Sequence, residues 1–425
     1  MSTVNVLKNV SLEARYDLLS LEPTAAKGDN CVFFTLPHSF RLSTDSGSTF
    51  QSFAWASPNA VFPGASTDWF GDNSTIWVPQ TKRFMWLLNH APTMGSTQQI
   101  RLAFTSSSDM KNTQGQYWVW LDIDPSTLGV TDSFDYSQLA VGENFLYITT
   151  YLASSAGVLG VAWIRIALRD LVAWDANSVG IEYFVSRSSS DFGMAQRCGS
   201  RAYWASHEKK SNLLRVYFID ESSASIAWQD IAIPVWNNLA YFYQSRTPDG
   251  FDWMGIPSAR ITGTFFAPDT LVFGWTAASD GTSERPHPYI YLVQLKQDLK
   301  TNKFTLVGIH HIFNSQFAWA FPGLSSVPSA GREGPLAISC GWGGGDLYFA
   351  NHAVGFIDLP LSGTSQFISK TVSKSTMGYD RWGDFLTVGN DEFEAHFLTA
   401  GYEIKSGGRR AERIAVPHYV VFSPF

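Results

Sequence analysis

The feature that most constrains the fold is a recurring pattern of short apolar runs separated by turn-forming residues along the whole chain. Aromatic and β-branched residues dominate the runs, and Gly, Pro, Ser and Thr interrupt them at short intervals. Hydrophobic residues make up 45% of the chain and aromatic residues 15%, which is enough to bury a large core. Charged residues make up only 16%, against a usual value of about 25%. The sequence therefore predicts an all-β fold.

The apolar runs group into recurrent units of roughly 45–65 residues, each compatible with four short strands, as is typical of propeller blades. No long amphipathic helix and no low-complexity linker divides the chain. We predict one closed β-propeller domain over residues 1–425, with seven four-stranded blades as first choice and six as the alternative. The strand-like runs of the seven units lie within 30–56, 75–123, 139–186, 194–233, 261–313, 335–373 and 385–425, and the connections between them make up the rest of each unit.

The ends of the chain are predicted to meet in the last blade. The sixth and seventh units each lack an obvious strand, and the segment SLEARYDLLSLE, residues 11–22, is available to complete the last one. Such closure would remove exposed sheet edges, which otherwise invite aggregation. A second pattern is an echo between QSFAWASPNAVFPG at 51–64 and QFAWAFPG at 316–323, which predicts equivalent corners of two different blades.

Charge and cysteine content exclude several classes of function. The formal net charge is −7 with no run of like charges, which argues against nucleic-acid binding and against a basic membrane-binding patch. Cys31, Cys198 and Cys340 are far apart and show no CxxC spacing, so neither a disulfide framework nor a zinc ribbon is expected. No signal peptide and no membrane-spanning segment is recognisable. We expect a soluble protein, either cytoplasmic or secreted, of open oligomeric state.

One short motif carries a resemblance to a known family. Ser43 to Phe50, STDSGSTF, matches the pattern S-x-D-x-G-x-T-[W/F], and resembles the Asp-box (BNR) repeat of sialidase-like and related carbohydrate-active propellers. The resemblance implies a structural turn between the outer two strands of a blade, with the Asp bound to backbone amides and the aromatic residue wedged into the blade. Elementary turn chemistry agrees, because Asp and Ser close turns and Gly accepts positive φ. The motif supports a fold, not an activity.

Three arginines are predicted to surround one sector of the axial opening. Arg260, Arg332 and Arg381 all fall at or just before the inner strand of the fifth, sixth and seventh units. Three guanidinium groups at one opening would bind a carboxylate, sulfate or phosphate, because each offers planar charge-assisted donors. Sialidase-like propellers grip a sugar carboxylate in this way. The alternative is that these arginines pair with nearby acids and tie the blades together.

Several histidines are predicted to project toward the same face. They sit where a second strand should end or in a long loop, namely His38, His90, His207, His352 and His287. Converging imidazoles can bind a metal, and a partnered histidine can act as a general base. Carotenoid oxygenases bind iron through four histidines in a seven-bladed propeller, but none of their motifs is present. The structural alternative is that the histidines end strands and cap loops, so the sequence requires no cofactor and His-bound metal is a minor possibility.

Candidate acid/base groups lie in the connections that precede inner strands. Asp384, two residues beyond Trp382, is the preferred acid, and Asp135 beside Tyr136 is the second. Further carboxylates come from the same kind of position, namely Asp68, Asp72, Asp252 and Glu333. Glycoside hydrolysis needs two carboxylates about 5–10 Å apart. Trp69 and Trp253 are candidate stacking platforms for sugar rings, with packing between blades as the alternative.

The leading hypothesis is a carbohydrate-directed propeller, either a hydrolase or lyase of an anionic glycan or a lectin that binds one. Substrate binding is assigned to Arg260, Arg332, Arg381, Trp69, Trp253 and His90. Proton transfer is assigned to Asp384, Asp135 and Tyr136, and His207 or His352 would be the base of a lyase. The alternatives are a non-catalytic protein-interaction scaffold and an enzyme that acts on an apolar small molecule, with or without His-bound metal.

Overall fold

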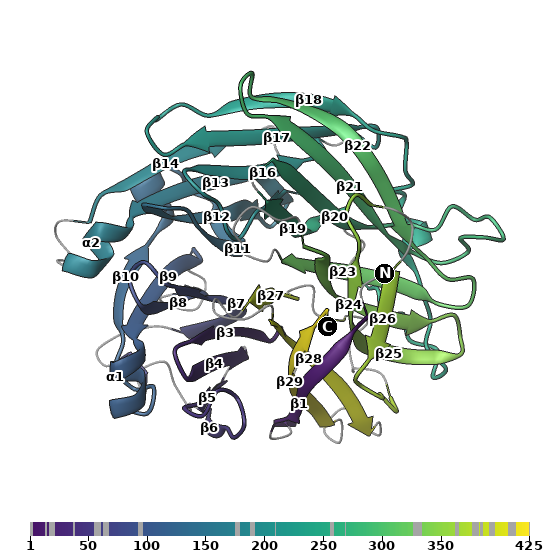
Figure 1. The fold of residues 1–425 in the computed structure, drawn as a ribbon, viewed down its shortest axis with the longest axis horizontal. Coiled ribbons are helices and arrows are strands. Elements are labelled where there is room, and N and C mark those ends of the chain that lie inside the picture. The colour runs from purple at the N-terminus through teal and green to yellow at the C-terminus, as the bar shows by residue number, and fades with distance from the viewer. Residues whose placement is uncertain are drawn as a thin grey trace.

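The computed structural model describes most of the chain. The described residues are 3–12, 15–16, 22–36, 39–54, 61–62, 68–91, 97–174, 179–187, 192–208, 210–255, 259–267, 269–325, 334–361, 365–375, 382, 386–390, 396–406 and 414–424. Seven antiparallel sheets surround a central axis, and each sheet forms one blade (Figure 1). The prediction of an all-β, seven-bladed propeller is confirmed, and six blades are excluded.

Each blade contains four strands that follow one another from the axis outward. The first blade is β3 (Thr24–Gly28), β4 (Cys31–Leu36), β5 (Ser39–Ser43) and β6 (Gln51–Ala54). The second is β7 (Asp68–Val78), β8 (Arg83–Ala91), β9 (Gln99–Ser106) and β10 (Val119–Ile123). The third is β11 (Ser133–Val141), β12 (Phe145–Ser154), β13 (Gly157–Ala167) and β14 (Ile181–Ser186).

The remaining blades follow the same order. The fourth is β15 (Gly193–Met194), β16 (Arg201–Ser206), β17 (Leu213–Asp220) and β18 (Ala227–Ala232). The fifth is β19 (Ile261–Ala267), β20 (Thr270–Ala277), β21 (Tyr289–Asp298) and β22 (Lys303–Ile312). The sixth is β23 (Ala318–Ser325), β24 (Leu336–Gly344), β25 (Tyr348–Ile357) and β26 (Ser365–Ser369). The seventh is β27 (Val388–Asn390), β28 (Phe397–Ser406), β29 (Ile414–Ser423) and β1 (Asn5–Ser11).

The ring closes because the N-terminal strand β1 pairs with the C-terminal strand β29, from Asn5 opposite Ser423 to Ser11 opposite His418. Closure by the two ends is confirmed, but the segment predicted to provide it is corrected. The closing strand lies before residues 11–22 except for its last residue, Ser11. Elsewhere in the described part of that segment, Leu12 donates its N–H to the Pro417 carbonyl and β2 (Arg15–Tyr16) pairs with the other end of β29. The closing strand alternates exposed and half-buried residues, as expected for an outer strand.

The FAWA echo does not mark equivalent corners. Its second copy lies in β23, the inner strand of the sixth blade. Of its first copy, 51–54 form β6, the outer strand of the first blade, and 55–60 lie outside the described residues. The likeness therefore arises from local composition, not from structural equivalence.

The chain direction gives the ring two distinct faces. Connections from the outer strand of one blade to the inner strand of the next lie on the same face as connections between second and third strands, and we call this the upper face. The lower face carries the two helices, α1 (Ser107–Asn112) and α2 (Leu168–Ala173). The upper face carries the short 3-10 turns η2 (Pro125–Leu128) and η3 (Ala240–Tyr243). Neither helix among the described residues is long and apolar enough to span a membrane.

The Asp-box turn lies between β5 and β6, the outer two strands of the first blade, as the resemblance implied. Asp45 Oδ1 accepts hydrogen bonds from the backbone N–H groups of Ser48 at 3.0 Å and Thr49 at 2.9 Å. These bonds, led by that of Thr49, hold the pKa of Asp45 well below its usual value. Gly47 adopts a φ of +79°, where a Cβ would meet the ring of Tyr419 on β29. The turn thereby also contacts the closing blade.

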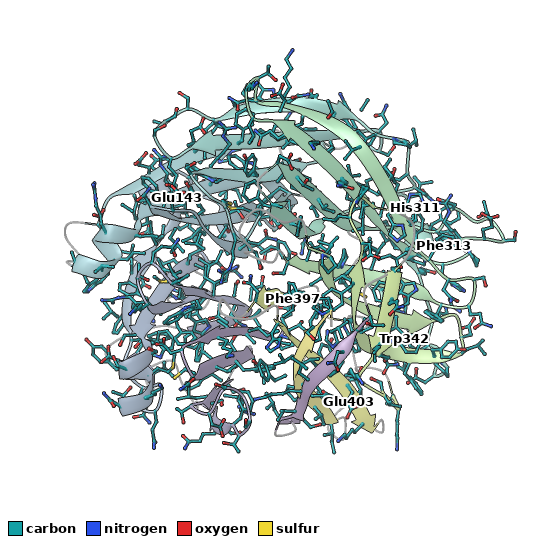
Figure 2. All side chains as sticks on the ribbon, viewed as in Figure 1. Glu143, His311, Phe313, Trp342, Phe397 and Glu403 are labelled. Carbon is teal, nitrogen blue, oxygen red and sulfur yellow. The ribbon has the colours of Figure 1, made fainter. Side chains whose placement is uncertain are left out.

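Side chains fill the spaces between the sheets (Figure 2), and many of the buried ones are aromatic. Between the first and second blades, the ring of Phe33 lies 5.2 Å from that of Trp86 and 5.0 Å from that of Trp118. Phe33 and Trp86 are fully buried. Such pairs contribute about 0.5–1.5 kcal/mol each beyond the burial of apolar area. Packing between blades, not within one, therefore holds the ring together.

The long connection between β18 and β19, residues 233–260, crosses the upper face of three blades. The backbone of Asn237 accepts a hydrogen bond from Ala278 after β20, and that of Arg246 accepts one from Asp346 after β24. Trp382, in the connection to β27, donates its N–H to the carbonyl of Trp253 at 3.0 Å. This connection therefore covers part of the upper face beside the axis.

Candidate functional site

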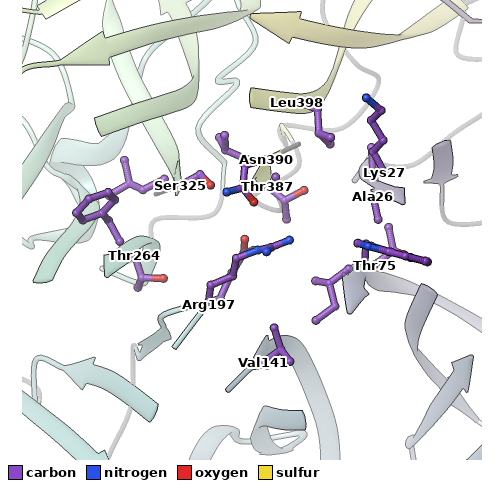
Figure 3. Close-up of a pocket in the computed structure, with 18 of the residues that line it drawn as sticks. Ala26, Lys27, Thr75, Val141, Arg197, Thr264, Ser325, Thr387, Asn390 and Leu398 are labelled. Atoms are coloured by element: carbon purple, nitrogen blue, oxygen red, sulfur yellow. The ribbon is translucent and has the colours of Figure 1, made fainter. Parts of the chain in front are cut away.

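The axial channel is lined by the inner strands of the ring and contains two cavities. The upper cavity, of about 30 Å³, lies toward the upper face, because its wall uses the early residues of the inner strands. It is lined by Ser74, Tyr136, Gln138, Leu139, Met194, Gln196, Thr262, Thr264, Gly323, Leu324, Leu386, Thr387 and Val388. The lower cavity, of about 40 Å³, continues toward the lower face, and its wall includes Lys27, Thr75, Arg197, Ser325 and Asn390. In Figure 3, Thr387 just before β27, Asn390 at the end of β27 and Arg197 after β15 point into this space.

Four inner strands are irregular where they border the upper cavity. The pairing register shifts between Trp69 and Asn73 in β7 and between Asp135 and Gln138 in β11. It also shifts after Ile261 in β19 and between Ala320 and Gly323 in β23. Bulges re-aim side chains and are over-represented beside active sites. This level of the channel is therefore the candidate functional site.

Two carboxylates meet at the bulges of the second and third blades. The backbone N–H of Tyr136 donates to Asp135 Oδ1 at 3.0 Å and to Asp72 Oδ2 at 3.3 Å. Because Asp135 Oδ1 and Asp72 Oδ2 are bound to the same nitrogen, the two carboxylates are close neighbours. Asp72 belongs to β7 and Asp135 to β11, so residues far apart in the sequence form one acidic pair. Both side chains are partly exposed.

A guanidinium group lies against the ring of Tyr136, whose N–H binds this pair. Arg260 immediately precedes β19, the inner strand of the fifth blade, where the sequence placed it. Its Cζ lies 4.1 Å from the ring centroid of Tyr136 and 5.1 Å from that of Tyr151. The two tyrosine rings are stacked at 5.5 Å, and both are buried. Contact with two aromatic faces fixes the position of the cation.

Tyr136 itself has an unusual backbone conformation. Its φ is +49°, in the left-handed region that a bulky residue rarely adopts. Such a conformation costs about 1–3 kcal/mol and persists where the surrounding structure imposes it, often at functional sites. Here the strained residue is the one whose N–H holds both carboxylates and whose ring supports Arg260.

The structure brings together Asp135, Tyr136 and Arg260 among the predicted site residues. Three others, Arg332, Arg381 and Asp384, lie outside the described residues. The sequence predicted that an inner strand follows Arg332. That prediction is wrong, because the strand that follows, β24, is the second strand of the sixth blade. Trp69 lies on β7, and its side chain is outside the described part of the structure.

Trp253 is not an exposed platform. Its side chain is 1% exposed and packs edge-on against Trp382, with ring centroids 6.0 Å apart. Trp382 in turn stacks on Tyr402 of β28 at 4.1 Å. The indole therefore anchors the connection 233–260 to the sixth and seventh blades. Packing against the blades, the alternative considered for this tryptophan, describes it.

Of the predicted histidines, His90, His207 and His352 are buried and lie in different blades, His287 is half-buried, and His38 lies outside the described residues. His207 follows β16 as expected and lies between Trp236 and Trp275, with ring centroids 4.9 and 4.4 Å away. His352 is fully buried in the middle of β25, a third strand, so its predicted place at the end of a second strand is wrong. Its Nε2 lies 2.7 Å from Ser339 Oγ. Burial lowers the pKa of each imidazole to about 3.

His90 ends the second strand β8 as predicted, but it serves an ion pair within its blade. Its Nε2 lies 3.6 Å from Asp122 Oδ1, and Arg101 forms two hydrogen bonds to the same carboxylate, at 2.7 and 2.6 Å. Burial opposes ionisation of Asp122, but Arg101 and His90 outweigh it and lower its pKa to about 2. Among the described residues, no group of three or more His, Cys, Asp or Glu is arranged to hold a metal.

A third cavity, of about 300 Å³, lies between the closing blade and the first blade. Its wall combines Leu7 and Lys8 of β1 with Lys27, the Asp-box residue Ser46 and residues of β28 and β29. Lys8 Nζ donates to the Ser46 carbonyl at 2.9 Å and to Ser48 Oγ at 3.1 Å. Because this lysine bridges the two blades, we assign the cavity to the closure of the ring.

Asp72 is the residue of the acidic pair that sequence reasoning did not select. It was one of several acids near the start of an inner strand, and its partner lies 63 positions further along the chain. One feature of the sequence could have indicated the pair, because Asp72 and Asp135 both lie near the start of an inner strand, in consecutive blades. Nothing in the sequence indicated the bulges that turn the two side chains toward one amide.

Comparisons with known proteins assign no family to the chain. No protein-family model matches the chain, and no curated protein matches its sequence. Similar solved structures include the Pan2 WD40 domain of Neurospora crassa, with 11% identity and a TM-score of 0.49 over 99% of this chain and 96% of that one. They also include the α-L-arabinofuranosidase Arb93A of Fusarium graminearum, with 10% identity and a TM-score of 0.45 over 97% of each chain.

A third similar structure is the lignostilbene dioxygenase of Pseudomonas brassicacearum, with 8% identity and a TM-score of 0.43 over 82% of this chain and 72% of that one. The three proteins differ in function, and such remote likeness does not choose among them. A function for this chain has to be argued from its own site.

Proposed function

We propose that the protein is a glycoside hydrolase that cleaves glycans of acidic sugars at the upper end of the axial channel. The observation that carries the proposal is the convergence of Asp72 and Asp135 on the N–H of Tyr136. Because one oxygen of each carboxylate is bound to the same nitrogen, the pair fits the ~5–5.5 Å spacing of retaining glycosidases better than the ~6.5–9.5 Å spacing of inverting ones. The proposed reaction therefore retains the configuration of the sugar.

The roles follow from the chemistry of a retaining enzyme. One carboxylic acid protonates the glycosidic oxygen as that bond breaks, while the other carboxylate attacks the anomeric carbon. Water then displaces the second carboxylate and gives its proton to the first. Arg260 would bind the acid group of the sugar, because a guanidinium fixed on two tyrosine rings is a preorganised partner for a carboxylate.

The test is hydrolysis of a panel of aryl glycosides of uronic acids, sialic acid and neutral sugars. We expect release of the aryl group from acidic glycosides, and a loss of at least about 100-fold in kcat for Asp72→Asn and for Asp135→Asn. Arg260→Gln should lower kcat/KM for acidic substrates by about 10- to 100-fold and leave neutral ones unaffected. Asp230→Asn, on the outer strand β18, is the matched control.

The outcomes separate the enzyme from its rivals. Wild-type protein that binds acidic glycans on an array but releases no product is a lectin. Protein that neither binds nor cleaves them contradicts the proposal. Full activity in Asp72→Asn and Asp135→Asn would remove this acidic pair from the mechanism even if the wild type is a hydrolase.

A protein-interaction scaffold is the second candidate, and one observation favours it. Val235, Leu239 and Tyr241, on the connection 233–260, are 74%, 60% and 75% exposed. Exposed apolar groups gathered on one segment are typical of interaction sites. A scaffold would retain its biological role in the Asp72→Asn/Asp135→Asn double variant, so complementation of a deletion strain by that variant distinguishes the two candidates.

A further inference from the structure

The two axial cavities are successive parts of one channel. Their walls share five residues, namely Gln196, Thr264, Leu324, Thr387 and Val388. Along β7 the upper cavity uses Ser74, while the lower one uses Thr75 and Trp77. Along β11 the upper cavity uses Tyr136 and the lower one Val141. The channel therefore runs from the level of Tyr136, whose N–H binds the acidic pair, toward the lower face.

Hydrogen-bonding groups line the channel at every level. The upper part has Ser74, Gln138 and Thr262, and the shared part has Gln196, Thr264 and Thr387. The lower part has Thr75, Arg197, Ser325 and Asn390. A buried water needs two to four polar partners and about 10–15 Å³, so cavities of about 30 and 40 Å³ each have room for roughly two or three waters. A sugar ring does not fit in them.

One side chain in the shared part of the wall requires a partner from solvent. The hydroxyl of Thr387 is buried and makes no hydrogen bond to any atom of the described residues. In Figure 3 its side chain points into the channel. A buried hydroxyl without a partner costs about 1–3 kcal/mol, and ordered water in a polar cavity removes that cost.

We propose that the channel holds a file of water molecules and delivers the hydrolytic water to Asp72 and Asp135 from the lower face. The delivery role rests on the proposed hydrolase function, because only hydrolysis consumes this water. The channel reaches Tyr136, whose N–H binds both carboxylates, from below, so water in it would approach the pair while a glycan occupies the upper end. The water oxygen bonds to the anomeric carbon, the bond to the nucleophilic carboxylate breaks, and the water proton passes to the other carboxylate.

The first test does not depend on activity. A high-resolution crystal structure of the wild-type protein should contain ordered waters within hydrogen-bond distance of Thr387 Oγ1 and along the polar groups of the shared part. Thr387→Val, which keeps the shape and removes the hydroxyl, should lose the water at that position. A channel without ordered water would overturn the proposal whatever the protein hydrolyses.

The second test follows the fate of the glycosyl-enzyme intermediate. Thr387→Met, which narrows the channel, should slow hydrolysis about tenfold. It should also raise the ratio of transglycosylation to hydrolysis in the presence of a monosaccharide acceptor. The acceptor is too large for the channel and enters from the upper face, so the substitution should not slow its reaction. Thr305→Val, on the outer strand β22, is the control. An unchanged ratio in a folded Thr387→Met variant overturns delivery through the channel.

Failure of the two proposals can be told apart. Wild-type protein that cleaves none of the glycosides contradicts the hydrolase and, with it, the delivery of water. In that case the crystal structure still decides whether the channel is hydrated.

Discussion

A single backbone amide organises the candidate site at the scale of residues. Tyr136 donates one N–H to two carboxylates and offers its ring to Arg260. The backbone N–H of Tyr136 points toward Asp72 of β7 instead of toward the partner strand β12. This orientation is accompanied by the strained positive φ of Tyr136. Replacing the side chain at this position would therefore disturb the acid pair and the cation together.

Buried histidines make the stability of the protein sensitive to acid. Burial lowers the pKa of both His207 and His352 to about 3, whereas an unfolded chain has histidine pKa values near 6.5. The native state keeps both imidazoles neutral, so the unfolded state binds more protons in this range. The free energy of unfolding should therefore fall as the pH is lowered from 6.5 toward 3, by up to about 1.4 kcal/mol per pH unit for each histidine.

Urea unfolding at several pH values between 4.5 and 7.5 measures this effect. The His207→Gln/His352→Gln double variant should be less stable than the wild type at pH 7.5 but should show a smaller loss of stability on acidification. Equal slopes in the wild type and the double variant would mean that other groups cause the acid sensitivity.

At the scale of elements, the outer strand β1 makes the closing blade dependent on the N-terminal segment. Deletion of residues 1–11 should expose the edge of β29, remove the packing of Val4 and Val6 on the core of that blade, and break the Lys8 contacts with the Asp-box turn. We expect the free energy of unfolding to fall by roughly 3–6 kcal/mol and the truncated protein to self-associate through the free edge.

Thermal unfolding and size-exclusion chromatography measure these effects. A synthetic peptide of residues 3–12 should restore stability and the monomeric elution of the truncated protein, whereas the same peptide with Val6→Asp should not. A truncated protein with an unchanged midpoint would show that the pairing of β1 and β29 contributes little to the ring.

The sequence predicted the outer and middle strands well and several inner strands poorly, for a physical reason. Inner strands converge on the axis, so they use small residues that do not form a recognisable apolar run. β3, with the sequence TAAKG, gives no strand signal, and a Cβ on Gly28 would meet the ring of Trp77. In β23, Pro322 and Gly323 indicate a turn, yet they form a bulge where a Cβ on Gly323 would lie 2.2 Å from the Leu386 carbonyl oxygen.

The same limit applied to the candidate site. Arg260, Asp135 and Tyr136 could be chosen because each lies at or next to the start of an inner strand. The pairing of Asp72 with Asp135 could not be predicted, because it depends on two bulges and on the contact between neighbouring blades. The burial of Trp253 and His352 could not be predicted either, because strand pattern alone does not separate a residue near the upper face from one between blades.

At the scale of the whole molecule, every blade packs against two neighbours, so losing one blade opens the ring. We expect residues 1–425 to unfold in one cooperative transition, with near-ultraviolet and far-ultraviolet circular dichroism changing at the same urea concentration. The truncated protein without β1 is the comparison, because its ring is already open at one edge. Two separated transitions in the wild type would contradict a single domain.

The pairing of β1 with β29 also sets the order of events during synthesis. β1 leaves the ribosome before the first six blades, and β29 emerges only after those six blades have been made. At ~5–20 residues per second, the nascent β1 waits on the order of tens of seconds for its partner. Its alternation of exposed and half-buried residues, with Lys8 among the apolar ones, keeps the waiting segment hydrated. The ring can therefore close only after the six intervening blades have been synthesised.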